Sequence, residues 1–299
     1  MQEMCDYRCA RIDRRSHRIN RINRISRIIL MFSVTIGGLA ALLYLVTGGL
    51  LGVRLSRAGT DRPLGKTTPL AIGLGAAVLH GIVLAQAMFR PEGVNLGFFN
   101  ALSLTGWLIA VVLLVAALTR PVENLGIILL PFSAATIILA LAFPSDRILT
   151  DVWHWPLELH IVVSILAYSL LALAVVQALL LEIQDRRLRG RHPGGFVRGI
   201  PPLITMESLL FQMIAVGFVL LGLSLLTGLL FLENIFAQHL VHKTVLSLIA
   251  WVVFGILLWG RWRFGWRGRM ALRWTLGGFV ALMLAYFGSK MVLELILAR

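Results

Sequence analysis

Charged residues are scarce in this chain of 299 residues, of which 14% are charged and 58% are apolar. Soluble globular domains carry about 25% charged and about 45–50% apolar residues. A chain so poor in charge cannot cover its apolar residues with a solvated surface. The composition therefore excludes an ordinary soluble domain and indicates an integral membrane protein.

Cysteine is also rare, because the chain holds only Cys5 and Cys9, both near its N-terminus. Two neighbouring cysteines exclude a disulfide framework and argue against a cysteine-based metal site. The sequence has no phosphate-cradling glycine motif, no zinc signature and no Ser/His/Asp pattern that would indicate nucleophilic catalysis. We therefore expect that the protein is not an enzyme.

Long apolar runs, in contrast, are abundant. A helix crosses about 30 Å of hydrocarbon with about 20 residues. Eight runs reach this length, at residues 28–51, 69–89, 96–118, 123–143, 157–181, 206–231, 240–260 and 271–297. They are apolar on all sides instead of alternating, which is typical of helices and not of barrel strands. The sequence predicts an all-α integral membrane protein, a bundle of about eight transmembrane helices.

Positive charge is unevenly distributed along the chain, whose net charge is +14. Three connections are rich in Lys and Arg, from Arg54 to Lys66, from Arg186 to Arg198 and from Arg261 to Arg269. If eight spans alternate in direction, these connections share one side, which the excess of Lys and Arg predicts to be cytoplasmic. The connections at 90–95, 144–156 and 232–239 and both termini are then predicted to be periplasmic.

The first 30 residues do not agree with this orientation. They contain eight arginines before residue 28, and such a segment normally stays in the cytoplasm. Arginine repeats there every three residues, whereas an amphipathic helix needs a period near 3.6. We interpret residues 1–30 as a misassigned start or a dispensable extension, with a basic membrane-surface helix as the alternative. The polytopic membrane domain is then predicted over residues 31–297.

Histidines lie inside several of the predicted spans. His160 is about one turn inside the outer end of span five, and His242 is equally shallow in span seven, so both can lie at one depth. His80 falls nearer the middle of span two. Imidazole is costly to bury in hydrocarbon and ligates metals, so these three are candidate ligands of a haem iron. A structural role is the alternative for an intramembrane histidine, and for His80 it would be a hydrogen bond to a neighbouring helix carbonyl.

Aromatic residues gather in the outer connection before span five. Trp153, His154 and Trp155 follow one another there, and Arg147 precedes them. An interfacial aromatic belt explains tryptophans at this level. In the functional interpretation, the flat indoles cover a porphyrin and Arg147 binds a propionate.

Two charged residues at span ends have simpler interpretations. Lys243, next to His242, is either an interfacial anchor or a cation that neutralises an anionic ligand. Glu207 lies near the start of span six, where a first-turn acid would complement the helix dipole.

Four stretches of the second half resemble the cytochrome c assembly family, and more narrowly its branch of YpjD/HemX-like bacterial inner-membrane proteins. They are LHIVVSILAY at 159–168, PPLITME at 201–207, HKTV at 242–245 and WGRWRFGWRG at 259–268. The likeness extends over about residues 31–297 and is most specific from His160 onward. It leaves the arginine-rich extension unmatched.

The resemblance implies a haem site. In relatives that handle haem, an outward tryptophan-rich loop is flanked by outward histidines that ligate the iron. Here Trp153 and Trp155 would belong to that loop, with His80 before it and His242 after it, and His160 would be a further family histidine. The resemblance therefore implies haem b as the cofactor, held near the outer face of a bacterial inner membrane. The expected partners are haem, membrane lipid and other cytochrome c maturation proteins or apocytochrome, and no nucleic acid.

A second function remains open at this point. The longer Trp-Gly-x-x-Trp-x-Trp-Asp pattern of haem-delivery members is reduced here to Trp153-His154-Trp155. This shorter loop favours an accessory or regulatory membrane subunit without haem, involved in control of haem synthesis or in divalent-cation homeostasis. The leading prediction is an integral membrane haem-binding protein that assists cytochrome c maturation or haem handling.

Overall fold

In the part of the chain that the structure describes, eight helices are long and apolar enough to cross a membrane. The structure is a computed structural model, which describes residues 31–57, 65–90, 93–144, 148–149, 155–190, 199–231 and 238–288. The prediction of an all-α membrane protein of about eight spans is confirmed. Residues 1–30 lie outside the described residues, so the proposed extension stays a prediction.

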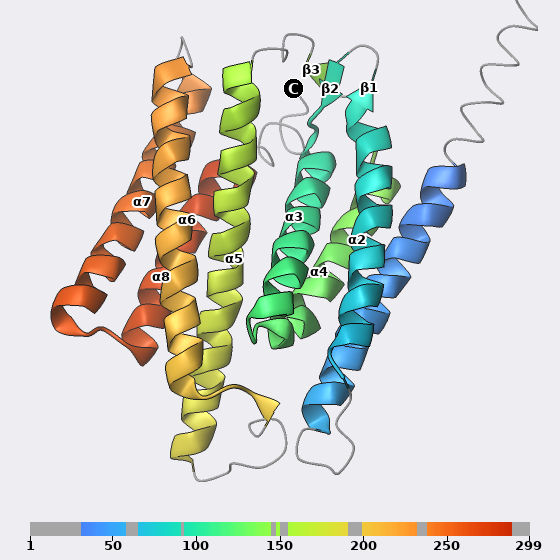
Figure 1. Ribbon diagram of the computed structural model, residues 1–299. Helices are drawn as coiled ribbons and strands as arrows, with labels where there is room; N and C mark the ends of the chain where they lie inside the picture. Colours follow the sequence, from blue (N-terminus) through green and yellow to red (C-terminus); the bar gives the residue numbers. More distant parts are fainter. Residues whose placement is uncertain are drawn as a thin grey trace, which may run out of the picture.

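The first four spans form one half of the bundle (Figure 1). Their bounds are α1 at Met31–Ser56, α2 at Thr67–Met88, α3 at Phe98–Thr119 and α4 at Gly126–Ala142, with the short 3-10 helix η1 at Glu123–Leu125 before α4.

The last four spans form the other half (Figure 1). They are α5 at Trp155–Arg189, α6 at Leu203–Phe231, α7 at Gln238–Phe264 and α8 at Gly268–Met283, and α8 continues into the π-helical turn η3 at Leu284–Gly288. Because α5 packs against α3 as well as against α6 and α8, it joins the two halves.

Helix α5 is longer than the apolar run that predicts it. The run ends near residue 181, whereas the helix continues to Arg189. Two ion pairs at i,i+4 spacing stabilise this last part, Arg186 Nε to Glu182 Oε1 at 2.6 Å and Arg189 Nε to Asp185 Oδ2 at 3.0 Å. The basic residues also suit the negative end of the helix dipole.

A small antiparallel sheet, which the sequence did not predict, closes one end of the first half. It has the order β1-β2-β3, with β1 at Phe89–Arg90, β2 at Gly93–Asn95 and β3 at Ile148–Leu149. Strands of two or three residues are too short to show the alternation by which a strand is recognised. Phe89 pairs with Val94, and Asn95 pairs with Ile148. The sheet therefore links the end of α2 to the segment that precedes α5.

Small residues allow the helices to pack closely, as in other membrane bundles. At Gly217 of α6, an added Cβ would lie 2.7 Å from a methyl group of Leu171 on α5. At Gly106 of α3, it would meet the side chain of Thr136 on α4. A larger residue at either position would require these neighbouring side chains to shift.

The helices alternate in direction, so the helix ends that flank the three basic connections lie together, at the bottom of Figure 1. The sheet and the start of α5 lie at the opposite end, at the top of the same view. The common end for the basic connections agrees with the predicted alternation. The membrane side that this end faces stays a prediction.

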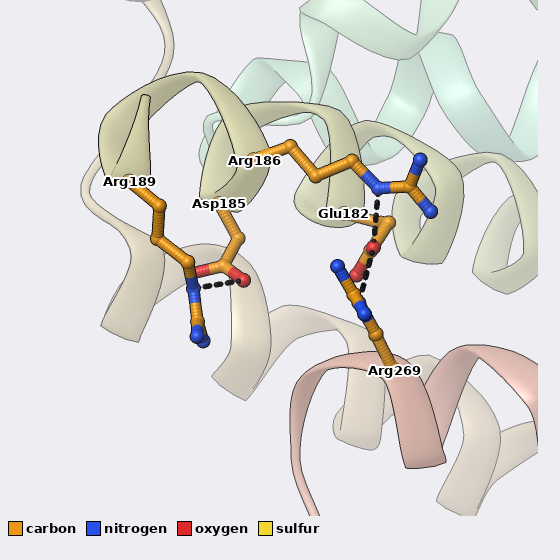
Figure 2. A network of polar contacts seen from close by, with 5 residues as sticks. All are labelled: Glu182, Asp185, Arg186, Arg189 and Arg269. Carbon is orange, nitrogen blue, oxygen red and sulfur yellow. Dashed lines mark hydrogen bonds and ion pairs between the residues drawn. The ribbon is translucent and has the colours of Figure 1, made fainter. Parts of the chain in front are cut away.

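Ion pairs hold the basic end together. Arg54 of α1 pairs with Glu123 of η1 at 2.8 Å. Figure 2 shows Glu182 of α5 between Arg186 of its own helix and Arg269 of α8, the latter at 3.2 Å. Glu182 is almost fully buried, so both cations are needed to offset its desolvation.

One sequence interpretation is corrected at this end. Glu207 was predicted to be a first-turn acid that complements the dipole of its helix, but the first turn of α6 contains no acidic residue. Glu207 instead accepts a hydrogen bond from Arg261 at the end of α7. Its position is therefore explained by an ion pair between helices.

Candidate functional site

A mostly apolar cavity lies between the beginning of α5, the end of α6, the beginning of α7 and the end of α8, and Thr105 of α3 also lines it. Its volume is about 290 Å³, close to the lower end of the range of small-molecule sites, about 300 Å³. Leucine and isoleucine side chains form most of its wall, among them Leu221, Leu225, Leu229, Ile161 and Ile165. A small number of polar groups interrupts this wall, and one of them is His160.

His160 is held by two groups of α6. Its Nδ1 lies 3.0 Å from the backbone carbonyl oxygen of Ser224 and 3.1 Å from Oγ1 of Thr227. A carbonyl oxygen only accepts hydrogen bonds, so Nδ1 must carry the proton. In the neutral ring Nε2 is then unprotonated, and it has no hydrogen-bond partner among the described residues. His160 therefore offers a free nitrogen lone pair on a side chain that lines the cavity.

The position of the His160 ring is set by hydroxyl groups that recur at helical spacing on the facing helices α5 and α6. His160 and Ser164 are four residues apart on α5, and Ser164 donates to the carbonyl oxygen of His160 at 2.5 Å. Ser224 and Thr227 are three residues apart on α6. The hydroxyls of Ser164 and Ser224 are 2.6 Å apart. This ladder sets the rotation of α5 against α6 and, with it, the direction of the imidazole.

The opposite wall of the cavity comes from α7 and from the end of α8. Lys243 and Ser247 of α7 line it, and Lys243 is the one cation among the described lining residues. Tyr286 lies in the π-helical turn η3, and single π turns are frequent at functional sites. The ring centroids of Tyr168 on α5 and of Phe279 are 5.2 Å apart, and Tyr168 completes the inner wall of the cavity. The cavity thus combines an imidazole, an ammonium group and aromatic rings.

His80 lies elsewhere in the molecule. It is completely buried in the first half, where its Nε2 is 2.9 Å from Oγ of Ser103 on α3. Its ring meets that of Tyr44 edge-on, with centroids 5.8 Å apart. His80 does not line the cavity of His160. The surroundings favour the structural alternative, with a serine hydroxyl in place of the expected carbonyl.

The remaining predicted site residues can be placed only in part. Arg147, Trp153 and His154 lie outside the described residues. Trp155 is the first residue of α5, and His242 lies in the first turns of α7, directly before Lys243. The side chains of Trp155 and His242 also lie outside the described part of the chain. The helix starts that carry them nevertheless border the cavity, because His160 and Lys243 line it.

The sequence interpretation missed the partners of His160. Ser224 and Thr227 lie in an otherwise apolar span, and their spacing places them on one helix face. Such a pair of hydroxyls in a membrane helix indicates a polar contact with a neighbouring helix. That signal was available, but it does not say which helix is the neighbour. Tyr286 had no comparable signal, because interfacial tyrosines are common.

Comparison with known proteins gives a family. Residues 70–297 match the model of the cytochrome C assembly protein family. The inner membrane protein YpjD of Escherichia coli K12 is 38% identical over 228 residues, which are 74% of this chain and 84% of that protein.

Two further relatives are more distant. An uncharacterized 28.8 kDa protein of Azospirillum brasilense is 35% identical over 190 residues, which are 61% of this chain and 69% of that protein. Protein HemX of Brevibacillus brevis is 20% identical over 234 residues, 75% of this chain and 85% of that protein. No solved structure gives a significant match. The chain belongs to the cytochrome c assembly family of membrane proteins, in the branch that includes YpjD.

Proposed function

We propose that this protein binds haem b in the cavity beside His160 and assists cytochrome c maturation or haem handling without being an enzyme. One observation carries the proposal. His160 lines an apolar cavity with Nδ1 committed to the carbonyl oxygen of Ser224, which leaves Nε2 for a metal. Histidines that ligate metals commonly donate their other ring nitrogen to such a carbonyl or to a carboxylate.

The residues of the cavity fit haem in their chemistry. Haem would supply a redox-active iron in an apolar macrocycle with two carboxylates. His160 would hold the iron, and the apolar wall of leucines and isoleucines would exclude water from the macrocycle. Lys243 would bind a propionate, in agreement with the second of the two roles that the sequence allowed for it.

His242 is the second residue that would hold the iron. It lies in the first turns of α7 next to Lys243, so its backbone is beside the cavity. Trp153 and Trp155 would cover the porphyrin from the segment around the start of α5, with His154 between them, and Arg147 would bind a propionate. His80 is the weakest of the candidates, because it is enclosed between Ser103 and Tyr44 away from this cavity.

The location and the partners of the protein belong to the same proposal. YpjD is named an inner membrane protein, which supports a bacterial inner membrane for this chain as well. The three basic connections favour the cytoplasm for their end of the bundle, so the cavity would face the periplasm. Haem and apocytochrome or other maturation proteins would then meet the protein at its periplasmic end.

An accessory or regulatory subunit without haem is the second candidate. The short tryptophan motif Trp153-His154-Trp155 is the observation that favours it, because the haem-delivery members carry a longer one. In this case the cavity would have no haem, and the protein would act through contacts with partners in haem-synthesis control or divalent-cation homeostasis.

The first test is the reduced-minus-oxidised absorbance spectrum of the purified protein, with a pyridine haemochrome assay. A b-type spectrum is expected for the wild type and should weaken strongly in His160→Ala and in His242→Ala. His192→Ala, in the basic connection between spans five and six, is the matched control and should keep its haem. A colourless wild type from cells supplied with haem would overturn the proposal and favour the accessory subunit.

A further inference from the structure

A second hollow lies at the basic end of the bundle, far along the helices from His160. It is a surface groove of about 470 Å³ between the beginning of α6 and the end of α7. Its wall includes Ile204, Phe211 and Ala215 of α6, and Arg261 and Arg267 contribute the positive charge. Neither the proposed haem site nor the family relationship gives this groove a role.

The charge in the groove is positive after all of its ion pairs are counted. Glu207 Oε1 lies 2.5 Å from Arg261 and 3.5 Å from Nε of Arg267. One carboxylate therefore faces two guanidinium groups, which leaves a net charge of one positive unit. Arg261 is also placed against Phe211, with its guanidinium carbon 4.7 Å from the ring centroid. This contact and the ion pair hold Arg261 in place, while Arg267 is 69% exposed.

The groove lies at the level of lipid headgroups. Three large aromatic residues near it are strongly exposed, Trp259 by 58%, Trp262 by 82% and Phe264 by 63%. Exposed aromatic side chains at the end of a transmembrane helix are typical of the membrane interface. We therefore expect the arginines of the connection between α7 and α8 to lie at the level of the lipid phosphates and not of the acyl chains.

The charged residues of the groove lie toward its outer end, and the deeper part along α6 combines apolar side chains with Ser208 and Gln212, which share a hydrogen bond. From Ile204 to Ala215 the helix rises by roughly 16 Å, into the membrane. Phe211 and Ala215 thus extend the groove toward the acyl chains, whereas Arg267 lies at its outer end. A free phosphate ion would use only the outer end. An amphiphile with a negative head and an apolar tail matches the whole length.

We propose that this groove binds one anionic phospholipid of the leaflet around it, with its phosphate at the exposed guanidinium group of Arg267, beside the Glu207–Arg261 ion pair, and an acyl chain along Phe211 and Ala215. Basic pockets between transmembrane helices bind anionic headgroups in this way. The bound lipid would join α6 to the α7–α8 connection. Glu207 would set the selectivity, because it orients Arg261 while leaving a net positive charge for a headgroup.

Native mass spectrometry of the full chain tests the proposal, with phosphatidylglycerol and phosphatidylcholine of identical acyl chains as probes. The wild type should retain one phosphatidylglycerol in preference to phosphatidylcholine. Arg267→Gln should lower this preference about fivefold, the effect of about one cation at a membrane surface. Arg189→Gln is the matched control, because Arg189 is 78% exposed and also paired with a carboxylate, but it does not line the groove.

A second variant and a competition experiment distinguish a bound lipid from a free phosphate ion or a protein partner as the occupant of the groove. Ala215→Trp fills the apolar part of the groove without changing its charge, so it should also reduce retention of phosphatidylglycerol. Inorganic phosphate at millimolar concentration should not displace the lipid. The proposal is overturned if Arg267→Gln keeps the wild-type preference, if Arg189→Gln loses as much, or if phosphate alone displaces the lipid.

Discussion

Two histidines inside the membrane bundle, His160 and His80, have similar partners but different surroundings. Each has one ring nitrogen near a hydroxyl group of another helix, Thr227 for His160 and Ser103 for His80. His160 lines a cavity, whereas His80 is completely buried beside the ring of Tyr44. The comparison teaches that similar hydrogen-bond partners do not distinguish the two histidines, whereas a cavity beside the side chain distinguishes a histidine that a ligand can reach from an enclosed one.

The other ring nitrogens, Nδ1 of His80 and Nε2 of His160, also have different surroundings. Nδ1 of His80 is buried and has no hydrogen-bond partner among the described residues, and the hydroxyl of the adjacent Tyr44 is in the same condition. Such groups lose their hydration without compensation, so they cost stability. Nε2 of His160 belongs to a side chain that lines a cavity, where a ligand can bind it. We therefore expect substitutions at the two histidines to have separate effects.

The largest expected effect is the loss of haem from His160→Gly. Removal of the imidazole should lower haem content more than tenfold, because the iron loses its ligand, and added imidazole should partly restore the spectrum. His80→Gly should keep its haem. Equal haem loss in the two variants, measured by the pyridine haemochrome assay, would break the distinction between the two sites.

The second prediction concerns the free energy of unfolding, for which the substitution of His80 should have the larger effect and that of His160 the smaller. His80→Ala should destabilise the protein by about 2–4 kcal/mol, because it leaves a cavity in a packed region and removes the partner of Ser103. His160→Ala, beside an existing cavity, should cost about 1 kcal/mol. Reversible unfolding in mixed micelles, followed by tryptophan fluorescence, measures both values. A larger loss for His160→Ala would contradict the structural role of His80.

A third prediction sharpens the account of His160. Thr227→Val removes the hydroxyl that lies 3.1 Å from Nδ1 but keeps the hydrogen bond to the Ser224 carbonyl oxygen. Changes in the groups that orient a ligating histidine commonly reduce affinity about 10–100-fold. Because one of two contacts remains, we expect a faster haem release by about tenfold, measured by transfer of haem to apomyoglobin. Thr205→Val, near the other end of α6, is the control and should release haem at the wild-type rate.

The smallest expected effect is at Tyr44. Its hydroxyl is buried and unpartnered within the described residues, so Tyr44→Phe removes a group that costs free energy and keeps the ring against His80. The free energy of unfolding should stay the same or rise by about 1 kcal/mol. A loss of more than that would show that the hydroxyl has a partner, and a bound water would be the first to examine.

Most of the fold could be predicted from apolar runs, but some of the helix ends and the short strands could not. The predicted and observed limits of span three, 96–118 and Phe98–Thr119, differ by no more than two residues. The end of α5 was placed eight residues too early, because charged residues after residue 181 were interpreted as connection. Their ion pairs at i,i+4 spacing extend the helix. The short sheet escaped prediction because its strands contain only two or three residues.

The candidate site was predicted less completely than the fold. His160 was identified because an imidazole is unusual in a membrane span; it lines a cavity, and its role as a ligand stays a prediction. His80 satisfied the same criterion, and no pattern separated the two. The difference depends on Ser224, which is 64 residues from His160 in the chain, and on Ser103, which is 23 residues from His80. No local pattern carries information about partners so far apart.

The sequence by itself determined the class of protein, the eight spans and the set of candidate histidines. It could do so because hydrocarbon forces each span to satisfy its backbone within one helix, so every span is a local property of the chain. Only the tertiary structure decided which histidine faces a cavity, which nitrogen carries its proton and which carboxylate pairs with which arginine. These features depend on the rotation and neighbours of each helix, which the packing of distant side chains determines.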